Sequence, residues 1–159
     1  MIILGIDPGL SVTGYGIMHK KGSQISILDY GAVRFSSKNH LSVRVGQFYE
    51  FFNEAIPKYK ITHISLETPF LGKNAQNFLK LGYLRGNIYL IANQHSLSIH
   101  EFAPREVKQA VTGWGGASKE QIARVVLQLF PGLEKPKRDD VTDALAVTVT
   151  ALWRAKTTM

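Results

Sequence analysis

Three aspartates open the last helical pattern of the chain, in the stretch RDDVTDALAV that runs from residue 138 to residue 147. Asp140 and Asp143 stand three positions apart there, so in a helix both would lie on one face about a turn apart. Two further acids, Asp7 and Glu67, each end an aliphatic segment far away in the chain. Acids in a first helical turn also favour the helix dipole and can cap the helix, so this stretch alone does not establish a functional site.

A shared site for these acids would require cations. Two carboxylates ~4 Å apart repel each other by about 4 kcal/mol at an effective dielectric constant of 20, and four together repel more. Mg²⁺ prefers carboxylate and water oxygens, and a pair of such ions roughly 4 Å apart can bind both the attacking and the leaving oxygen of a phosphodiester. Convergence of the four acids would therefore indicate metal-assisted phosphoryl chemistry.

Hydrophobic patterns predict the elements that must position these acids. Short apolar or alternating runs predict strands at residues 1–6, 12–20, 24–35, 61–67 and 96–102. Apolar residues at three- and four-residue steps predict a helix from Leu41 that ends at Pro57 and a long helix that carries Phe78 to Ile91. Two short helical patterns precede the helix of Asp140. This order predicts an α/β fold with a five-stranded mixed sheet, three antiparallel strands and then two parallel ones, flanked by helices on both faces.

The predicted sheet could bring the distant acids together. If the first and fourth strands are parallel neighbours, Asp7 and Glu67 meet at the carboxyl edge of the sheet, where ligands of open α/β sheets bind. Asp7 could instead simply start a turn, and Glu67 could be a solvated strand end. An apolar stripe that begins at Val141 would dock the last helix on the sheet and bring Asp140 and Asp143 toward the same edge.

Composition limits the class of protein. The chain has 159 residues, 45% of them hydrophobic, so residues 1–159 are expected to form a single domain. Nineteen Lys and Arg against 12 Asp and Glu give a formal charge of +7, which favours nucleic acid as a partner, although an incidental basic surface gives the same count. The absence of cysteine excludes disulfides and thiolate metal sites. Apolar runs are too short for a signal sequence or a membrane span, so we expect a soluble, cytoplasmic protein.

The chain resembles the RuvC family of Holliday junction resolvases in five motifs that occur in the family's order: GIDPGLSVTGYGI, LE at 66 and 67, GKNAQNFLKLGYLRG, PREVKQAVTGWG and DDVTDALAV. The resemblance implies a ribonuclease H-like fold and a DNA endonuclease that resolves four-way junctions in recombination and repair. It implies paired, symmetric, metal-dependent nicks in two strands of like polarity. It also places the catalytic and metal-binding carboxylates on Asp7, Glu67, Asp140 and Asp143, which leaves Asp139 as a cap or a solvated neighbour.

Cofactors and partners follow from the same resemblance. It implies dependence on Mg²⁺. From the four acids we hypothesise two Mg²⁺ ions per active site, for which Mn²⁺ can substitute, and products with a 5′-phosphate and a 3′-hydroxyl. The resemblance implies a homodimer that works on bacterial nucleoid DNA in the cytoplasm with a branch-migration helicase complex. Gly82 and Gly86 each cost about 1 kcal/mol in a helix interior, so another element should approach them closely. The family suggests the second subunit, and packing against the sheet of the same chain is the competing explanation.

Five further residues are candidates for DNA contact. Phe70 matches a family aromatic near the junction centre, where stacking on an unpaired base would be worth ~1–3 kcal/mol; ordinary core packing is the alternative. Lys73 and Asn74 follow in the same loop and could hold the phosphate backbone. Lys108 and Lys119 match family lysines near the active site, and a cation at the start of a helix, such as Lys119, suits a bound phosphate better than the helix dipole. For each lysine, an indifferent exposed charge is the alternative.

Other functions share some of these features. The GIDPG opening also resembles the phosphate loop of the sugar kinase and actin class, but those enzymes need two such domains. A related ribonuclease H-like nuclease could act on other structured nucleic acid, and a non-catalytic junction-binding protein would not need the complete acidic set. The segment GWGGASK fails the Walker pattern, so we interpret it as a mobile loop that could touch DNA, before a helix that Ser118 and Gln121 start with a capping box.

Overall fold

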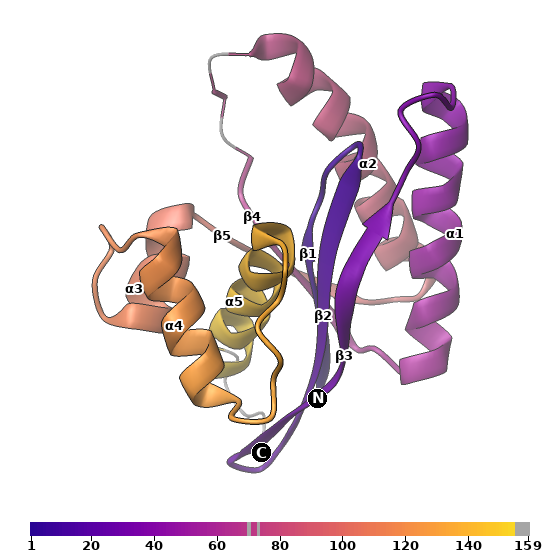
Figure 1. The fold of residues 1–159 in the computed structure, drawn as a ribbon. Helices are drawn as coiled ribbons and strands as arrows, with labels where there is room; N and C mark the ends of the chain where they lie inside the picture. Colours follow the sequence, from indigo (N-terminus) through magenta and orange to yellow (C-terminus); the bar gives the residue numbers. More distant parts are fainter. Residues whose placement is uncertain (70, 73, 155–159) are drawn as a thin grey trace.

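A five-stranded mixed sheet runs through the middle of the molecule (Figure 1). The computed structural model describes residues 1–69, 71–72 and 74–154. Its strands are β1 Ile2–Asp7, β2 Val12–Lys21, β3 Gln24–Arg34, β4 His63–Glu67 and β5 Ser98–Phe102, in the spatial order β3-β2-β1-β4-β5. Antiparallel pairing joins β1 to β2 and β2 to β3, and parallel pairing joins β1 to β4 and β4 to β5. The predicted fold class is confirmed.

Helices cover both faces of this sheet. One face carries α1 Leu41–Tyr59 and α2 Ala75–Gln94, and the other carries α3 Pro104–Thr112, α4 Lys119–Leu129 and α5 Asp139–Arg154 (Figure 1). Alternation along β1 serves two separate cores: Ile3 packs in the core that includes α5, whereas Leu4 and Ile6 pack in the core that includes α1 and α2. The period of two therefore directs Gly5 and Asp7 to the α5 face.

The two long helices begin close to where the patterns predict, but the predicted end of α1 is wrong. Pro57 lies inside the helix, which continues to Tyr59 and ends at Lys60 in the left-handed conformation (φ 54°). A proline in the last turn removes only one late hydrogen bond, and the Lys60 N–H closes the helix on the carbonyls of Ile56 and Pro57. Among the described residues, no helix is both long and apolar enough to cross a membrane.

Helix α5 approaches the sheet closely because glycines face it. A Cβ on Gly5 would stand 1.9 Å from the Thr148 hydroxyl oxygen, and a Cβ on Gly14 would stand 2.0 Å from the carbonyl oxygen of Asp140. The Ser65 hydroxyl donates to the carbonyl of Val147 at 2.9 Å, so the sheet also binds the helix backbone directly. No larger residue than glycine could occupy these two strand positions without moving α5.

Gly82 and Gly86 of α2 do not pack against the sheet of the same chain. An added Cβ on Gly82 or Gly86 would meet no atom within 4 Å in the part of the chain that the structure describes. Packing against the chain's own sheet is therefore wrong as the explanation of these two glycines. Both line an open hollow between α1 and α2 instead.

Replacing Gly14 by alanine should destabilise the protein, because the new Cβ would press on the backbone of the first turn of α5. Overpacking of this kind costs roughly 1–3 kcal/mol, which urea unfolding followed by circular dichroism can measure. Gly46→Ala is the matched control: in α1 its Cβ meets no atom within 4 Å, and helix propensity should raise stability by up to about 1 kcal/mol. Unchanged stability of Gly14→Ala would contradict the need for close approach.

Candidate active site

Asp7 and Glu67 end neighbouring parallel strands. The register pairs Ile6 with Leu66, so the next residue on each strand, an acid in both cases, follows at the same edge of the sheet. Leu66 belongs to the core on the α1 and α2 side, so alternation directs Glu67 to the α5 face, as it directs Asp7. The structure therefore brings these two acids together as the strand order predicts.

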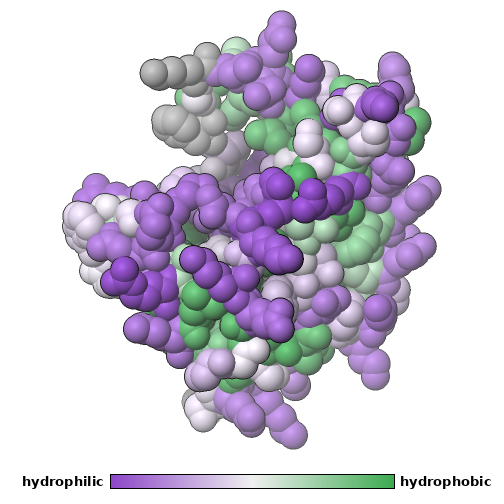
Figure 2. All heavy atoms as spheres, in the orientation of Figure 1, coloured by the Kyte–Doolittle hydropathy of each residue, from purple (hydrophilic) through white to green (hydrophobic). Residues whose placement is uncertain are grey.

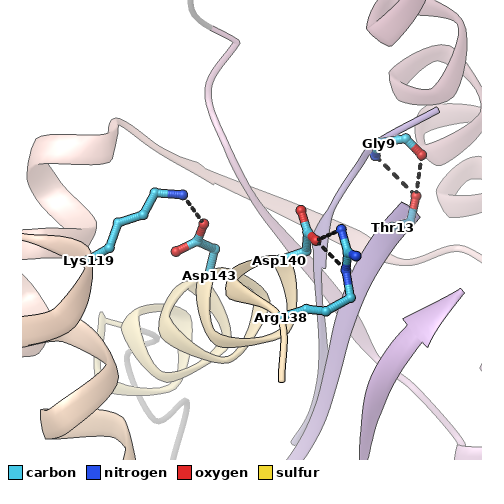
Figure 3. Close-up of polar contacts among 6 residues, drawn as sticks. All are labelled: Gly9, Thr13, Lys119, Arg138, Asp140 and Asp143. Carbon is cyan, nitrogen blue, oxygen red and sulfur yellow. Dashed lines mark hydrogen bonds and ion pairs between the residues drawn. The ribbon is translucent and has the colours of Figure 1, made fainter. Parts of the chain in front are cut away.

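Asp140 and Asp143 stand in the first turns of α5, at the end of the helix that lies against this edge. In Figure 3 each is engaged by a cation from a different side. The Arg138 guanidinium donates to Asp140 Oδ2 through two nitrogens, each 2.9 Å away, and the Lys119 ammonium donates to Asp143 Oδ2 at 3.0 Å. Asp139, the first residue of the helix, is exposed, in agreement with a solvated neighbour.

Burial and mutual repulsion act on this group of acids. Burial raises the pKa of Asp7 from its ordinary value of 3.8 to about 7, with further upward contributions from Asp143, Asp140 and Glu67. Burial, and then the charge of Asp143, also raise the pKa of Glu67. The hydrogen bond to Asp143 raises the pKa of Lys119, which holds that cation in its charged form. The charges of the neighbouring acids thus reach both Asp7 and Glu67.

The acidic side chains of the site are not arranged as a metal coordination shell. Within residues 1–69, 71–72 and 74–154, no three Asp, Glu or His side chains converge closely enough to hold a metal ion. Asp140 and Asp143 are turned toward Arg138 and Lys119, which supply the positive charge locally. Carboxylate oxygens whose repulsion raises a pKa fit a hard divalent cation, and such an ion would replace these two ion pairs.

Hollows flank the acidic end of α5. One of about 390 Å³ lies beside Asp140 and Arg138 and extends along the turn after β1 to Asn77 on α2. That turn is held by Thr13, which is fully buried and exchanges two hydrogen bonds with the backbone of Gly9, at 3.0 and 3.1 Å (Figure 3). Figure 2 shows the surrounding face as largely hydrophilic, with a hollow between the part formed by α3 and α4 and the part formed by α2. The setting suits a charged, extended ligand.

Arg85 is a positioning residue that the sequence patterns do not reveal. Its guanidinium donates to the carbonyl oxygen of Glu67 at 2.8 Å and forms an ion pair with Glu101 on β5. Tyr89 donates a second hydrogen bond to Glu101 at 2.8 Å. Arg85 and Tyr89 belong to α2, so this network ties that helix to the ends of β4 and β5. Arg85 lies between Gly82 and Gly86 in the sequence and belongs to no periodic pattern that could have identified it.

The structure describes three of the five predicted DNA-contact residues. Phe70 and Lys73 lie outside the described residues. Asn74 caps α2, accepting a hydrogen bond from the Asn77 N–H at 3.1 Å, which is a structural role that the sequence reasoning missed. Lys108 is partly buried on α3, and its charge acts on Glu67. The predicted capping box of α4 is confirmed, since Ser118 and Gln121 exchange hydrogen bonds at 3.2 and 2.8 Å.

Comparisons with known sequences agree on one family. The sequence model described as Crossover junction endodeoxyribonuclease RuvC matches residues 3–151. A protein of that description from Pelodictyon phaeoclathratiforme is 42% identical over 154 residues, 97% of this chain and 81% of the relative. Another from Brevibacillus brevis is 38% identical over 156 residues, covering 98% and 94% of the two chains.

Solved structures give the same picture. A RuvC from Thermus thermophilus, solved in complex with a Holliday junction substrate, superposes with a TM-score of 0.89 at 27% identity, covering 96% of this chain and 93% of that one. The yeast mitochondrial Holliday junction resolvase superposes with a TM-score of 0.68 at 15% identity, covering 93% and 76%. At that identity the second match supports the fold alone.

The stability of the metal-free protein should depend on the protonation of Asp7. Its pKa of about 7 in the folded state exceeds the ordinary 3.8, so its contribution to stability is complete below pH 4 and is lost as the pH rises through 7. In a chelating buffer, Asp7→Asn should match the wild type near pH 4 and exceed it at pH 8, by an amount on the order of a few kcal/mol. Urea unfolding at several pH values measures this difference.

Comparing the two proteins isolates Asp7 from other titrating groups. Burial lowers the pKa of His63, so protonation of His63 weakens the fold as the pH falls, in both proteins alike. That effect cancels in the difference between Asp7→Asn and the wild type. Parallel stability curves for the two proteins across pH 4 to 8 would contradict the raised pKa of Asp7.

Proposed function

This chain belongs to the RuvC family of crossover junction endodeoxyribonucleases, and from that premise we propose that it cleaves Holliday junctions with Asp7, Glu67, Asp140 and Asp143. The enzyme is a DNA endonuclease, and its reaction is hydrolysis of phosphodiester bonds at a four-way junction. The observation that carries the residue assignment is the meeting of two strand-end acids with the acidic first turns of α5. The paired nicks fall in two strands of like polarity.

The family's reaction is metal-dependent, and we assign two Mg²⁺ ions, replaceable by Mn²⁺, to these carboxylates. The all-oxygen donor set and the mutual repulsion that raises the pKa of Asp7 support this assignment. When bound, such ions polarise the phosphodiester and stabilise the charge that develops as water attacks phosphorus and the 3′-oxygen leaves. The 5′-phosphate stays with the other fragment.

The protein's own cations can change partners during this reaction. Lys119 now neutralises Asp143, and Arg138 neutralises Asp140. If divalent ions took the place of these two ion pairs, both cations would be available to the phosphate. We assign Lys119, with Lys108 nearby on α3, to stabilise the charge that develops on the scissile phosphate. Positive charge bound beside Asp7 would lower its pKa and favour the ionised form, because repulsion from the acidic neighbours is part of what raises that pKa.

Paired cleavage requires two active sites, and we propose that α2 forms the interface of a homodimer. An apolar hollow of about 620 Å³ lies between α1 and α2, bordered by Val45, Gly82, Gly86, Tyr83 and Leu90. Tyr83 and Leu90 are about half exposed, at 54% and 49%. The open space above the two glycines would admit the helix of a second subunit, which would compensate the cost of glycine in a helix interior.

The cellular setting follows from the substrate. We propose that residues 1–159 act as one nuclease domain on nucleoid DNA in the bacterial cytoplasm, together with the branch-migration helicase complex that brings junctions to it. The two sequence relatives named above come from Pelodictyon phaeoclathratiforme and Brevibacillus brevis. We further propose that Phe70, Lys73 and Asn74, in the segment before α2, contact the junction.

Asp7→Asn should abolish cleavage while it preserves binding. On a symmetric junction with a mobile core in Mg²⁺, the rate should fall at least about a thousandfold, because a metal-binding charge is lost. Asp139→Asn is the matched control and should cleave near the wild-type rate, since Asp139 is exposed. Nicks are mapped at nucleotide resolution, with plain duplex and RNA–DNA hybrid as alternative substrates. Wild-type cleavage by Asp7→Asn, or a preference for hybrid over junction, would refute the assignment.

Leu90→Glu should dissociate the proposed dimer, because it buries a charge in an apolar interface. Sedimentation equilibrium should then report a monomer, and junctions should receive single nicks in place of paired ones. Leu129→Glu is a suitable control, since Leu129 is an exposed leucine (39%) on α4, on the other face of the sheet. A Leu90→Glu protein that remains dimeric would exclude α2 as the interface.

A further inference from the structure

The connection between α3 and α4, residues 113–118, presents a tryptophan that is exposed but firmly held. Trp114 is 60% exposed. The backbone N–H of Trp114 donates to the Thr112 hydroxyl oxygen at 3.2 Å, and the Trp114 carbonyl accepts hydrogen bonds from the Thr112 hydroxyl at 3.1 Å and from the Ala117 N–H at 3.2 Å. The backbone that carries the exposed side chain is therefore fixed by hydrogen bonds.

Two glycines let neighbouring side chains lie flat on this connection. A Cβ on Gly116 would stand 2.7 Å from Cζ2 of the Trp114 indole, and a Cβ on Gly115 would stand 2.8 Å from Cγ of Arg105. The indole and the arginine stem therefore each rest against the loop backbone. Such packing limits the positions that the indole can take and leaves the guanidinium of Arg105 beside the same loop.

Two arginines lie beside this connection. Arg105 and Arg124 are exposed, and within the described ranges neither takes part in a recorded ion pair. Arg124 and Trp114 border a shallow hollow of about 230 Å³. Of the two acids on these helices, Glu106 is paired with Arg154, and Glu120 is exposed on α4.

The surface is continuous with the active site. The connection leads directly into Lys119, whose ammonium contacts Asp143. In Figure 1 it lies between α3 and α4, on the outer side of α5. A nucleic acid strand that reaches the acids past Lys119 would therefore continue over this part of the molecule.

We propose that Trp114, Arg105 and Arg124 form a contact for one duplex arm of the junction, outside the junction centre. The two guanidinium groups bind phosphates of the arm, and the exposed indole packs against deoxyribose. The inference rests on the proposed function, because binding of a junction brings the duplex arm that this surface contacts. A contact of this kind positions the scissile strand without reading its sequence.

Affinity measurements separate the three side chains. In the binding-competent Asp7→Asn background, Trp114→Ala should weaken junction binding about fivefold or more, as truncation of an anchoring tryptophan does at an interface. Arg105→Gln and Arg124→Gln should each reduce the slope of log K against log salt by about one, because each releases one phosphate contact. Lys21→Gln, an exposed cation at the far end of the sheet, should leave that slope unchanged.

Tryptophan emission reports the contact directly. The chain has two tryptophans, so Trp153→Phe leaves Trp114 as the single reporter. Its emission should change when a junction or a plain duplex binds, since an arm contact needs no unpaired base. Trp114→Phe should recover most of the affinity lost in Trp114→Ala. A merely structural role of the loop would not predict an effect of Arg124→Gln on binding, because Arg124 lies outside the loop.

The outcomes distinguish this inference from the proposed function. If the parent protein neither binds nor cleaves junctions, the proposed function fails. If the parent binds and cleaves but Trp114→Ala keeps full affinity and the Trp114 emission does not respond, the arm contact is overturned. A response to a junction with an unpaired base, without any response to duplex, would also overturn it and indicate base stacking instead.

Discussion

The close approach of α5 to the sheet is the constraint on which the site depends. Gly5 and Gly14 leave room for the helix backbone, and the Ser65 hydroxyl binds a carbonyl of the helix. Residues 141–152 of α5 are buried apart from Asp143, so the helix can shift only by disturbing a core. Its acidic first turns are thereby held against strands whose ends are also acidic. A helix a few ångströms farther out would leave the same four acids as unrelated surface charges.

Repulsion among these acids is the cost of this arrangement, and two cations partly offset it. Burial and three neighbouring carboxylates raise the pKa of Asp7 to about 7, while Lys119 opposes the rise. Arg138 and Lys119 each engage one acid of α5. A site held together by hydrophobic packing elsewhere can tolerate such repulsion, because the helix that carries the acids is stabilised along its buried length and not at its charged end. The acids can therefore bind divalent ions without a change in the fold.

Local periodicity made much of this predictable. The positions of Asp7 and Glu67 at the ends of two apolar strands, with the parallel order of these strands, predicted that the two acids meet, and the structure agrees. Pairings between residues distant in the sequence have no such signal: Arg85 with the Glu67 carbonyl and Lys119 with Asp143 emerge only in three dimensions. Pro57 shows the limit of a local rule, because a proline that is excluded from a helix interior is tolerated in the last turn. The catalytic roles of the acids remain a prediction from sequence and geometry together.

Helix α2 takes part in two arrangements that would otherwise be independent. Arg85 binds the end of β4 and pairs with Glu101, while Tyr83 and Leu90 of the same helix border the apolar hollow that a second subunit would fill. A rigid helix transmits small displacements along its length, so a shift of α2 on subunit association would also shift the guanidinium that holds the Glu67 backbone. Assembly and metal affinity would then be thermodynamically linked: the dimer would bind divalent ions with a different affinity from the monomer, and ions would in turn change the dimerisation constant by the same factor.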